Sequence, residues 1–461
     1  MAGRMKEIVR THGNSDHLGS DPTMNSQKNQ KQRTMGGSGR IVVAAMLGLA
    51  LAGCDTAGLL EVDLPGNVTA GDVESPGLAS TMRVAAIGDF EWAWDTYVNY
   101  AARHSDEYIH SSGNFTARRQ MLRDIPGDLG AYQSTIFGRW HTARMMLEQN
   151  FERLQGFTDQ EVPNRARYMA EMRTYGGFVY IAFGEGFCGT PIDGDGQVRT
   201  PAQLLETAVD RFTEALQLAQ AANQPHLVNA ARVGRARAYL GLQQYGAAIS
   251  DAELVPEGFT FSATRDQSQG RRENSMAATN RLMTNQAATV APGYRDVRWK
   301  GVPDPRVNVT NTGFVGHDNS TIVWRHDKTP AVGGHGQDVI IASHREALLF
   351  IAEAAALTGD LGRAREIMNH FHDVAGIPPV TVEDTPTQEA VIRQVIEERR
   401  RELFVEGGHR HRDQLRWQGT PYAIPFLGEP GSDHPDGVDD YGQVYGTTTC
   451  LPVAQNEQVG S

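Results

Sequence analysis

The chain has 461 residues, of which 40% are hydrophobic and 21% charged, and its formal net charge is -12. This composition is typical of a globular protein that forms one large domain or a few smaller ones. The acidic excess argues against binding to nucleic acid and against a basic lipid-binding surface, and it does not speak for or against a neutral ligand.

The N-terminal part of the sequence indicates export. Residues 1–34 are polar and lack apolar periodicity, so we interpret them as disordered or as sequence upstream of a true start at Met35. Residues 35–53 combine a short basic stretch with an apolar run that is too short to span a bilayer. That order is typical of a signal peptide.

The predicted signal peptide ends on the tetrapeptide L-A-G-C, which matches a bacterial lipobox. It predicts that Cys54 carries acyl chains such as palmitate, which anchor a protein firmly to a membrane. A plain secretory signal is the alternative. Residues 54–80 contain several Gly and Pro and predict a lipidated tether. Residues 81–461 are predicted to form a single domain.

The first helix of this domain is predicted over residues 82–111, which are rich in aromatic side chains. Trp94, Tyr97 and Val98 share one helical face, and this favours core packing. Trp92 lies off that face and is the candidate for an exposed aromatic that stacks on a ligand.

Helical periodicity recurs through residues 132–256, with helices predicted over 132–154, 165–183, 228–242 and 245–254. Another begins at Thr200-Pro201, because Thr suits the cap of a helix and Pro its first position. Small residues on the apolar faces make the last pair similar to a tetratricopeptide repeat. Such a pair must stack on its neighbours to bury its apolar face.

Residues 257–337 are rich in Gly, Asn, Thr and Pro and contain only short extended runs. Long irregular insertions on a helical scaffold commonly carry binding function. Trp299 and Trp324 are therefore candidates for ligand contact. A loop packed over the helices fits the same composition.

Helical patterns return over residues 338–417, first in 338–376 and then from Val391 onward. The second stretch contains the charged run 397–402, in which Glu397 is spaced to pair with Arg400 and Arg401, and Glu398 with Arg401. The run is compatible with a solvated helix face. It is equally compatible with an interior lock between helices, since Arg can grip a carboxylate through two hydrogen bonds.

The order E-E-R-R-R-E-L-x-x-E-G-x-x-x-x-D-x-x-R-W at residues 397–417 resembles the signature of the SusD/RagB family. Residues 346–376 and 451–457 resemble two further family elements, and 302–306 resembles its D-P-R element. The chain departs from the pattern at Ser343 and His372, where family members usually have Arg. From the signature we expect a structural ion-pair cluster of Glu398, Arg399, Glu402, Glu406, Asp413 and Arg416.

The resemblance implies a mainly α, SusD-like fold with tetratricopeptide-like helix pairs, at about 132–256 and 338–417, and a loop-rich ligand-binding region with few short strands. It implies a surface-exposed lipoprotein of the outer membrane that binds a glycan, a peptide or another nutrient. The expected partner is a SusC-type TonB-dependent transporter, to which the nutrient is delivered. Asp55 would be the second residue of the mature protein, and an Asp at that position holds lipoproteins at the inner membrane in some bacteria. A tetratricopeptide-like protein-interaction scaffold without a nutrient is the alternative function.

Apart from Cys54, the sequence contains two cysteines, Cys188 and Cys450. An even pair in an oxidising compartment favours a disulfide between them, with two free thiols as the alternative.

Motifs for catalysis or metal binding are absent from the sequence: it has no P-loop, HExxH or GxSxG motif. The His-x-His pairs at 370–372 and 409–411 lack Cys partners and have Arg neighbours, so we expect no metal site. We expect no cofactor and no enzymatic activity.

Overall fold

The computed structural model describes residues 75–192, 194, 196–280, 287–330 and 333–455. All of them belong to one unit of the chain, Val68–Ser461. The predicted upstream segment, signal peptide, Cys54 and most of the tether lie outside the described residues, as do the last two residues of the 451–457 element.

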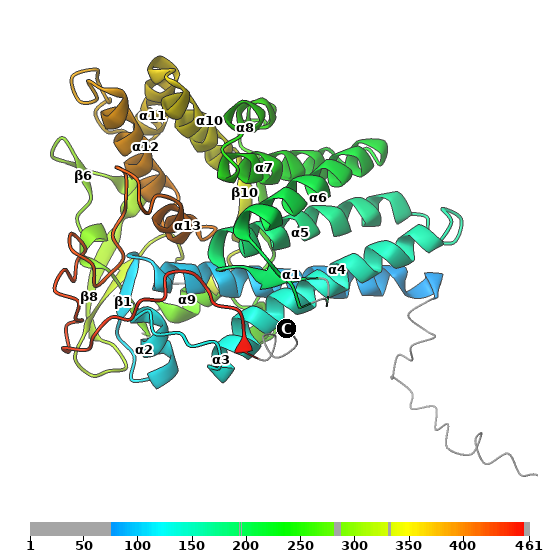
Figure 1. Cartoon of the computed structure of the whole chain (residues 1–461), viewed down its shortest axis with the longest axis horizontal. Coiled ribbons are helices and arrows are strands. Elements are labelled where there is room, and N and C mark those ends of the chain that lie inside the picture. Colours follow the sequence, from blue (N-terminus) through cyan, green and yellow to red (C-terminus); the bar gives the residue numbers. More distant parts are fainter. Residues whose placement is uncertain (1–74, 193, 195, 281–286, 331–332, 456–461) are drawn as a thin grey trace, which may run out of the picture. The chain divides into compact units, whose positions relative to one another are not determined.

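Helices dominate the described residues, as predicted (Figure 1). They are α1 Ala79–His104, α2 Phe115–Met121, α3 Gly130–Tyr132, α4 Gly138–Gly156, α5 Arg165–Gly186, α6 Pro201–Ala221, α7 Pro225–Gly241, α8 Tyr245–Ala252, α9 Ser275–Thr279, α10 His344–Thr358, α11 Leu361–Ala375, α12 Gln388–Glu402 and α13 His409–Arg416. None of these helices is both long and apolar enough to cross a bilayer, within the part of the chain that is described.

The strands are short and pair two by two, always antiparallel. The pairs are β1 Tyr108–His110 with β5 Ala288–Val290, β2 Thr190–Pro191 with β3 Val198–Arg199, β4 Thr260–Ala263 with β10 Val339–Ser343, β6 Arg298–Trp299 with β7 Val302–Pro303, and β8 Val309–Val315 with β9 Ile322–His326. Most of them lie in the predicted loop-rich region, which therefore consists of hairpins and turns attached to a helical scaffold.

Helix α1 runs through the core. Trp94 and Tyr97 are fully buried, as predicted, and the Trp94 ring meets Trp140 of α4 and Phe178 of α5 at centroid distances of 6.2 and 5.9 Å. The prediction that this helix extends to residue 111 was wrong. It ends at His104, because residues 108–110 leave the helix to pair with β5.

Helices α5, α6 and α7 pack closely because two glycines accept one aromatic ring. A Cβ added to Gly177 of α5 would lie 2.5 Å from the ring of Phe212, and one added to Gly234 of α7 would lie 2.2 Å from it. Phe212 of α6 is fully buried between them. The predicted start of α6 is confirmed, since Thr200 forms a capping box with Gln203.

Two predicted helices are interrupted. Residues Gln133–Phe137 form a turn of π-helix (η3) between α3 and α4, where one continuous helix was predicted. Residues 339–343, predicted as helix, form β10, because their β-branched side chains pair with β4. Helix α10 begins only after Ser343, whose hydroxyl accepts a hydrogen bond from the backbone N–H of Glu346 at 3.2 Å.

Candidate functional site

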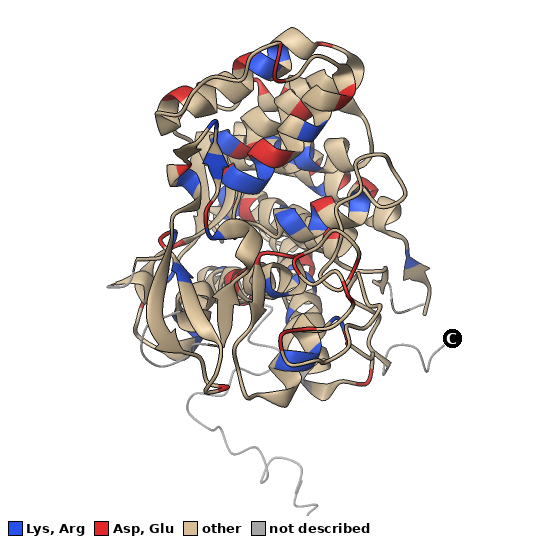
Figure 2. Ribbon diagram, turned by 90° about the vertical axis from the view of Figure 1, so that its left-hand side faces the viewer, with Lys and Arg blue, Asp and Glu red and all other residues tan. Residues whose placement is uncertain are grey.

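The charged run of α12 lies in the interior, which was one of the two predicted alternatives. Glu398 and Arg399 are buried, and so are Glu402 and Asp413. Figure 2 shows basic and acidic residues interleaved on neighbouring helices, without separation into a basic and an acidic face. Buried charges are costly unless each finds a partner, so their pairing decides what the run does.

One set of pairs joins α12 and α13 to α10. The Nε of Arg399 donates to Asp413 at 2.8 Å and lies 3.3 Å from a carboxylate oxygen of Glu353. The Nε of Arg416 donates to the other oxygen of Asp413 at 2.9 Å, and its two terminal nitrogens donate to Glu353. Two arginines thus share two carboxylates, and every oxygen of the group is used.

A second set is centred on Arg237 of α7, which is fully buried. Its guanidinium donates to Glu185 of α5 at 2.5 Å, to Glu346 of α10 at 3.2 Å and to the carbonyl of Gly407 at 2.8 Å. Arg412 of α13 adds a further pair to Glu185 at 2.8 Å. These contacts connect four helices that lie far apart in the sequence.

A third set attaches the loop-rich region. Glu398 was predicted to pair with Arg401, but it accepts from Arg306 at 2.7 Å and lies 2.8 Å from His372 Nε2. His372 Nδ1 also faces an acceptor, the carbonyl of Pro378 at 2.6 Å. The histidine therefore occupies one of the positions where the family usually has Arg and still meets the carboxylate.

The remaining members of the predicted cluster are paired in the same way. Arg345 of α10 donates to Glu402 at 2.6 Å and to Glu406 at 3.1 Å, and Lys328 donates to Glu406 at 2.6 Å. Glu397 pairs with Arg400 and Arg401, as its spacing predicted.

Cys188 and Cys450 form a disulfide across a sequence separation of 262. The backbone reinforces this junction, because Cys188 N–H donates to the carbonyl of Leu451 at 2.9 Å and Leu451 N–H donates to Gly186 at 2.8 Å. The C-terminal segment is thereby held against the end of α5.

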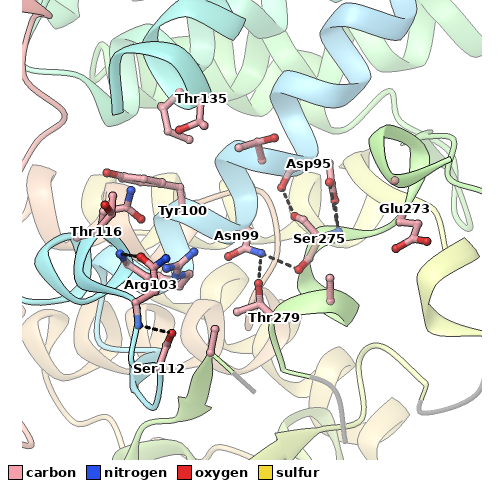
Figure 3. Close-up of a pocket in the computed structure, with 18 of the residues that line it drawn as sticks. Asp95, Asn99, Tyr100, Arg103, Ser112, Thr116, Thr135, Glu273, Ser275 and Thr279 are labelled. Carbon is pink, nitrogen blue, oxygen red and sulfur yellow. Dashed lines mark hydrogen bonds between the residues drawn. The ribbon is translucent and has the colours of Figure 1, made fainter. Parts of the chain in front are cut away.

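A cavity of about 650 Å³ lies beside α1 (Figure 3). One face of α1 forms its wall through Trp92, Asp95, Thr96, Asn99, Tyr100 and Arg103. Opposite walls come from α2 with its cap Asn114, from the π-helical turn through Thr135 and Ile136, from α4 through Arg139, and from α9. π-Helical turns often occur at functional sites, and here the turn supplies one wall.

Hydrogen bonds hold the α1 wall to α9. Asn99 Nδ2 donates to the carbonyl of Ser275 at 2.7 Å and to the hydroxyl of Thr279 at 2.6 Å. Asp95 accepts from the Ser275 N–H at 3.0 Å, and burial raises the pKa of this carboxyl to about 6. Figure 3 shows these contacts on one side of the cavity. The polar wall is therefore fixed before any ligand enters.

Some polar atoms of the wall have no partner among the described residues. They are Asn99 Oδ1, the hydroxyl of Tyr100 and Arg103 Nε, all shielded from solvent. Buried polar groups are normally hydrogen bonded to protein or to ordered water, so these three atoms mark a part of the wall that the protein's own side chains do not satisfy.

The structure separates the three predicted tryptophans. Trp92 is half-buried and lines the cavity, where the guanidinium groups of Arg139 and Arg271 lie over its ring at 3.6 and 4.6 Å. Trp299 packs against His372 at a centroid distance of 5.4 Å, and Trp324 lies under Arg295 at 5.2 Å. Neither of these two lines the cavity beside α1.

Sequence reasoning missed Asn99, Tyr100, Arg103 and Arg139 as site residues. A signal was present for the first three. With Trp92, they follow a stripe at helical spacing along α1, and a polar stripe on an otherwise buried helix marks a face that does not pack against the core. Arg139 gave no such signal, because its place depends on how α4 meets α1.

No group of His, Cys, Asp and Glu suited to a metal ion occurs in the part of the chain that the structure describes. The ionic residues of the 397–417 signature do not line the cavity. The signature and the cavity are thus separate features, one used in packing and the other open to a ligand.

A comparison with known protein families matches the SusD family over residues 263–449. A comparison with curated proteins finds no match. Among solved structures, a SusD-like carbohydrate binding protein from Bacteroides vulgatus has a TM-score of 0.64 and 14% identity, and the alignment covers 84% of this chain and 96% of that one.

Two further solved structures are similar. A SusD superfamily protein from Parabacteroides distasonis has a TM-score of 0.62 and 13% identity, with 85% of this chain and 98% of that one covered. One from Bacteroides thetaiotaomicron has a TM-score of 0.60 and 13% identity, with 82% and 97% covered. At such low identity the likeness shows a common SusD-like fold.

Proposed function

We propose that the chain is a protein of the SusD/RagB type and a nutrient-binding lipoprotein of the bacterial outer membrane surface, which the match of residues 263–449 to the SusD family and the SusD-like fold support. It captures a glycan or another oligomeric nutrient and passes it to a SusC-type TonB-dependent transporter. The lipobox supports the anchor at Cys54, and the family resemblance supports the transporter as partner.

The cavity beside α1 is the observation on which the proposal depends. Its volume of about 650 Å³ is within the range of small-molecule sites. Hydroxyl and amide side chains dominate its walls, with Trp92 and Tyr100 as the aromatic components. Saccharides present hydroxyl groups together with apolar ring faces, and this combination of wall groups suits both.

Capture without cleavage is the proposed activity. The carboxyl groups that line the cavity are those of Asp95 and Glu273, and each is engaged by the protein. Asp95 accepts from the Ser275 N–H, and Glu273 lies 2.8 Å from His335 Nδ1. A glycosidase uses two carboxyl groups that flank the scissile bond, whereas we assign these two to holding the cavity wall.

Binding is tested with the mature chain from Asp55 onward against panels of oligosaccharides and peptides, by calorimetry. We expect at least one oligosaccharide to bind, and we expect Trp92→Ala to weaken it about tenfold or more, since loss of stacking area costs at least ~1 kcal/mol. Trp299→Ala and Trp324→Ala, in the same assay, test the sequence-based prediction for those two residues.

The transporter is tested by purifying the full, anchored protein from its native membrane. Recovery of a TonB-dependent barrel in about equal amounts supports delivery. A protein partner of another kind, together with no ligand from either panel, would favour the tetratricopeptide-like scaffold and reject nutrient capture.

A further inference from the structure

Arg103 has an unusual position for an arginine of this protein. It lines the cavity, its Nε is shielded from solvent without a hydrogen-bond partner, and no described carboxylate forms an ion pair with it. Burial lowers the pKa of its guanidinium. Arg stays protonated in proteins, so this cation lacks a counter-charge.

Arg139 repeats the pattern from another wall of the cavity. Its guanidinium lies over Trp92 and donates to the hydroxyl of Thr96 at 2.7 Å. It forms no ion pair with a carboxylate of the described residues, whereas Arg271, the other cation over Trp92, is paired with Asp89. Asp95 acts on this charge without touching it, so the N–H donors of Arg139 that Thr96 does not use are open to a ligand.

The acidic groups of the cavity do not neutralise these two cations by direct contact. Asp95 is held by the backbone of Ser275, and Glu273 by His335. In a chain with a net charge of -12, a cavity with two unpaired guanidinium groups is a local exception.

We propose that the cavity selects an acidic oligosaccharide, in which the carboxylates of separate uronic acid units bind Arg103 and Arg139. A planar guanidinium offers paired N–H donors that match a carboxylate. The hydroxyl and amide side chains of the other cavity walls are open to the sugar hydroxyls beside it. This inference rests on the proposed function and narrows its ligand class.

The test compares uronic acid oligosaccharides, namely galacturonate, mannuronate, guluronate and glucuronate types, with their methyl esters. The ester removes the charge and keeps the sugar. We expect at least one acid to bind tenfold or more tightly than its ester. A sulfated oligosaccharide and an oligoglutamate peptide are included, and tighter binding of either one than of every uronate would overturn the assignment.

Failure of the inference differs from failure of the proposed function. Neutral oligosaccharides that bind as tightly as every acid, or more tightly, would overturn the acidic assignment and leave glycan capture standing. If no saccharide binds but a peptide does, the acidic-sugar assignment fails and nutrient capture stands, and if neither panel gives a ligand, the proposed function itself fails.

Variants assign the preference to the two arginines. We expect Arg103→Gln and Arg139→Gln each to lower affinity for the acid tenfold or more while changing affinity for the ester less than threefold. Arg119→Gln is the matched control, because Arg119 lies on α2 and pairs with Asp124 outside the cavity. Equal losses for acid and ester would show that the arginines only shape the cavity.

Unfolding without ligand gives an independent check. Replacing Arg103 by Gln leaves no carboxylate unpaired, so we expect the melting temperature of Arg103→Gln to equal or exceed that of the unmodified protein. A fall of several degrees would show that Arg103 has a structural partner, and this would overturn its assignment to a ligand.

Discussion

Glu107 is a buried carboxyl group that holds a turn of the backbone in place. Its buried carboxyl accepts the backbone N–H of Val405 at 2.7 Å. Val405 has φ of 52°, a conformation that is rare for a β-branched residue, so the hydrogen bond stabilises a strained turn before α13. Burial raises the pKa of Glu107 to about 8.

The raised pKa predicts a pH-dependent stability. The folded protein binds a proton at Glu107 that the unfolded chain releases above about pH 4.5, so the free energy of unfolding falls as pH rises toward 8, by at most ~1.4 kcal/mol per pH unit. Glu107→Gln keeps an acceptor for Val405 and removes the titration. Urea unfolding between about pH 5 and about pH 8 should show the variant gaining stability relative to the unmodified protein. Parallel pH profiles would contradict the prediction.

Arg237 is expected to contribute far more to stability than a surface arginine. Arg237→Met leaves Glu185 and Glu346 without a partner in the interior, and such a loss costs about 3–5 kcal/mol. Arg363→Met is the control, since Arg363 and Glu253 form an exposed pair at 3.0 Å whose loss costs under ~1 kcal/mol. Denaturant unfolding measures both, and similar effects would argue against the structural role of the Arg237 contacts.

At the scale of elements, α5, α6 and α7 can meet around Phe212 because Gly177 and Gly234 have no side chain. Gly234→Ala places a Cβ against the Phe212 ring, and we expect a loss of about 1–3 kcal/mol from overpacking. Gly246→Ala on α8 meets nothing within 4 Å and should be neutral or stabilising by up to ~1 kcal/mol. Thermal unfolding of the two variants decides whether packing or helix propensity governs these positions.

Most helices could be predicted because their apolar periodicity and caps are local. Thr200-Pro201 is an example, since the cap and the first residue are adjacent in sequence. Residues 339–343 could not be predicted reliably from the flanking helical pattern, because the strand forms only when β4, some 80 positions earlier, pairs with it.

The cavity was only partly predictable for the same reason. The helical face of Trp92 predicted that it lies off the core, but the structure shows it half-buried, with Arg139 and Arg271 over its ring. The ion pairs of the 397–417 signature, which lie apart from the cavity, show the same limit. Glu398 was assigned to Arg401 by spacing within one helix, whereas its partners Arg306 and His372 come from other elements. Long-range electrostatic pairing has no signature in local spacing.

For the whole molecule, the disulfide between Cys188 and Cys450 connects the C-terminal segment to the helical scaffold. In the chain-entropy description, closing so long a loop stabilises the fold by roughly 5 kcal/mol, and measured values are commonly 2–4 kcal/mol. We expect the double variant Cys188→Ser, Cys450→Ser to unfold at a lower denaturant concentration. Mass spectrometry of a non-reduced digest should recover the linked peptide, and two free thiols would contradict the pairing.

Across the whole molecule, the central claim is that the cavity beside α1 captures a nutrient saccharide. The most direct test is a crystal structure of the protein with the oligosaccharide that binds best in the panels. The account predicts a sugar in contact with Trp92 and Asn99, with its charged group, when it has one, at Arg103. A sugar bound elsewhere, for example against Trp299 or Trp324, with this cavity empty, would contradict it.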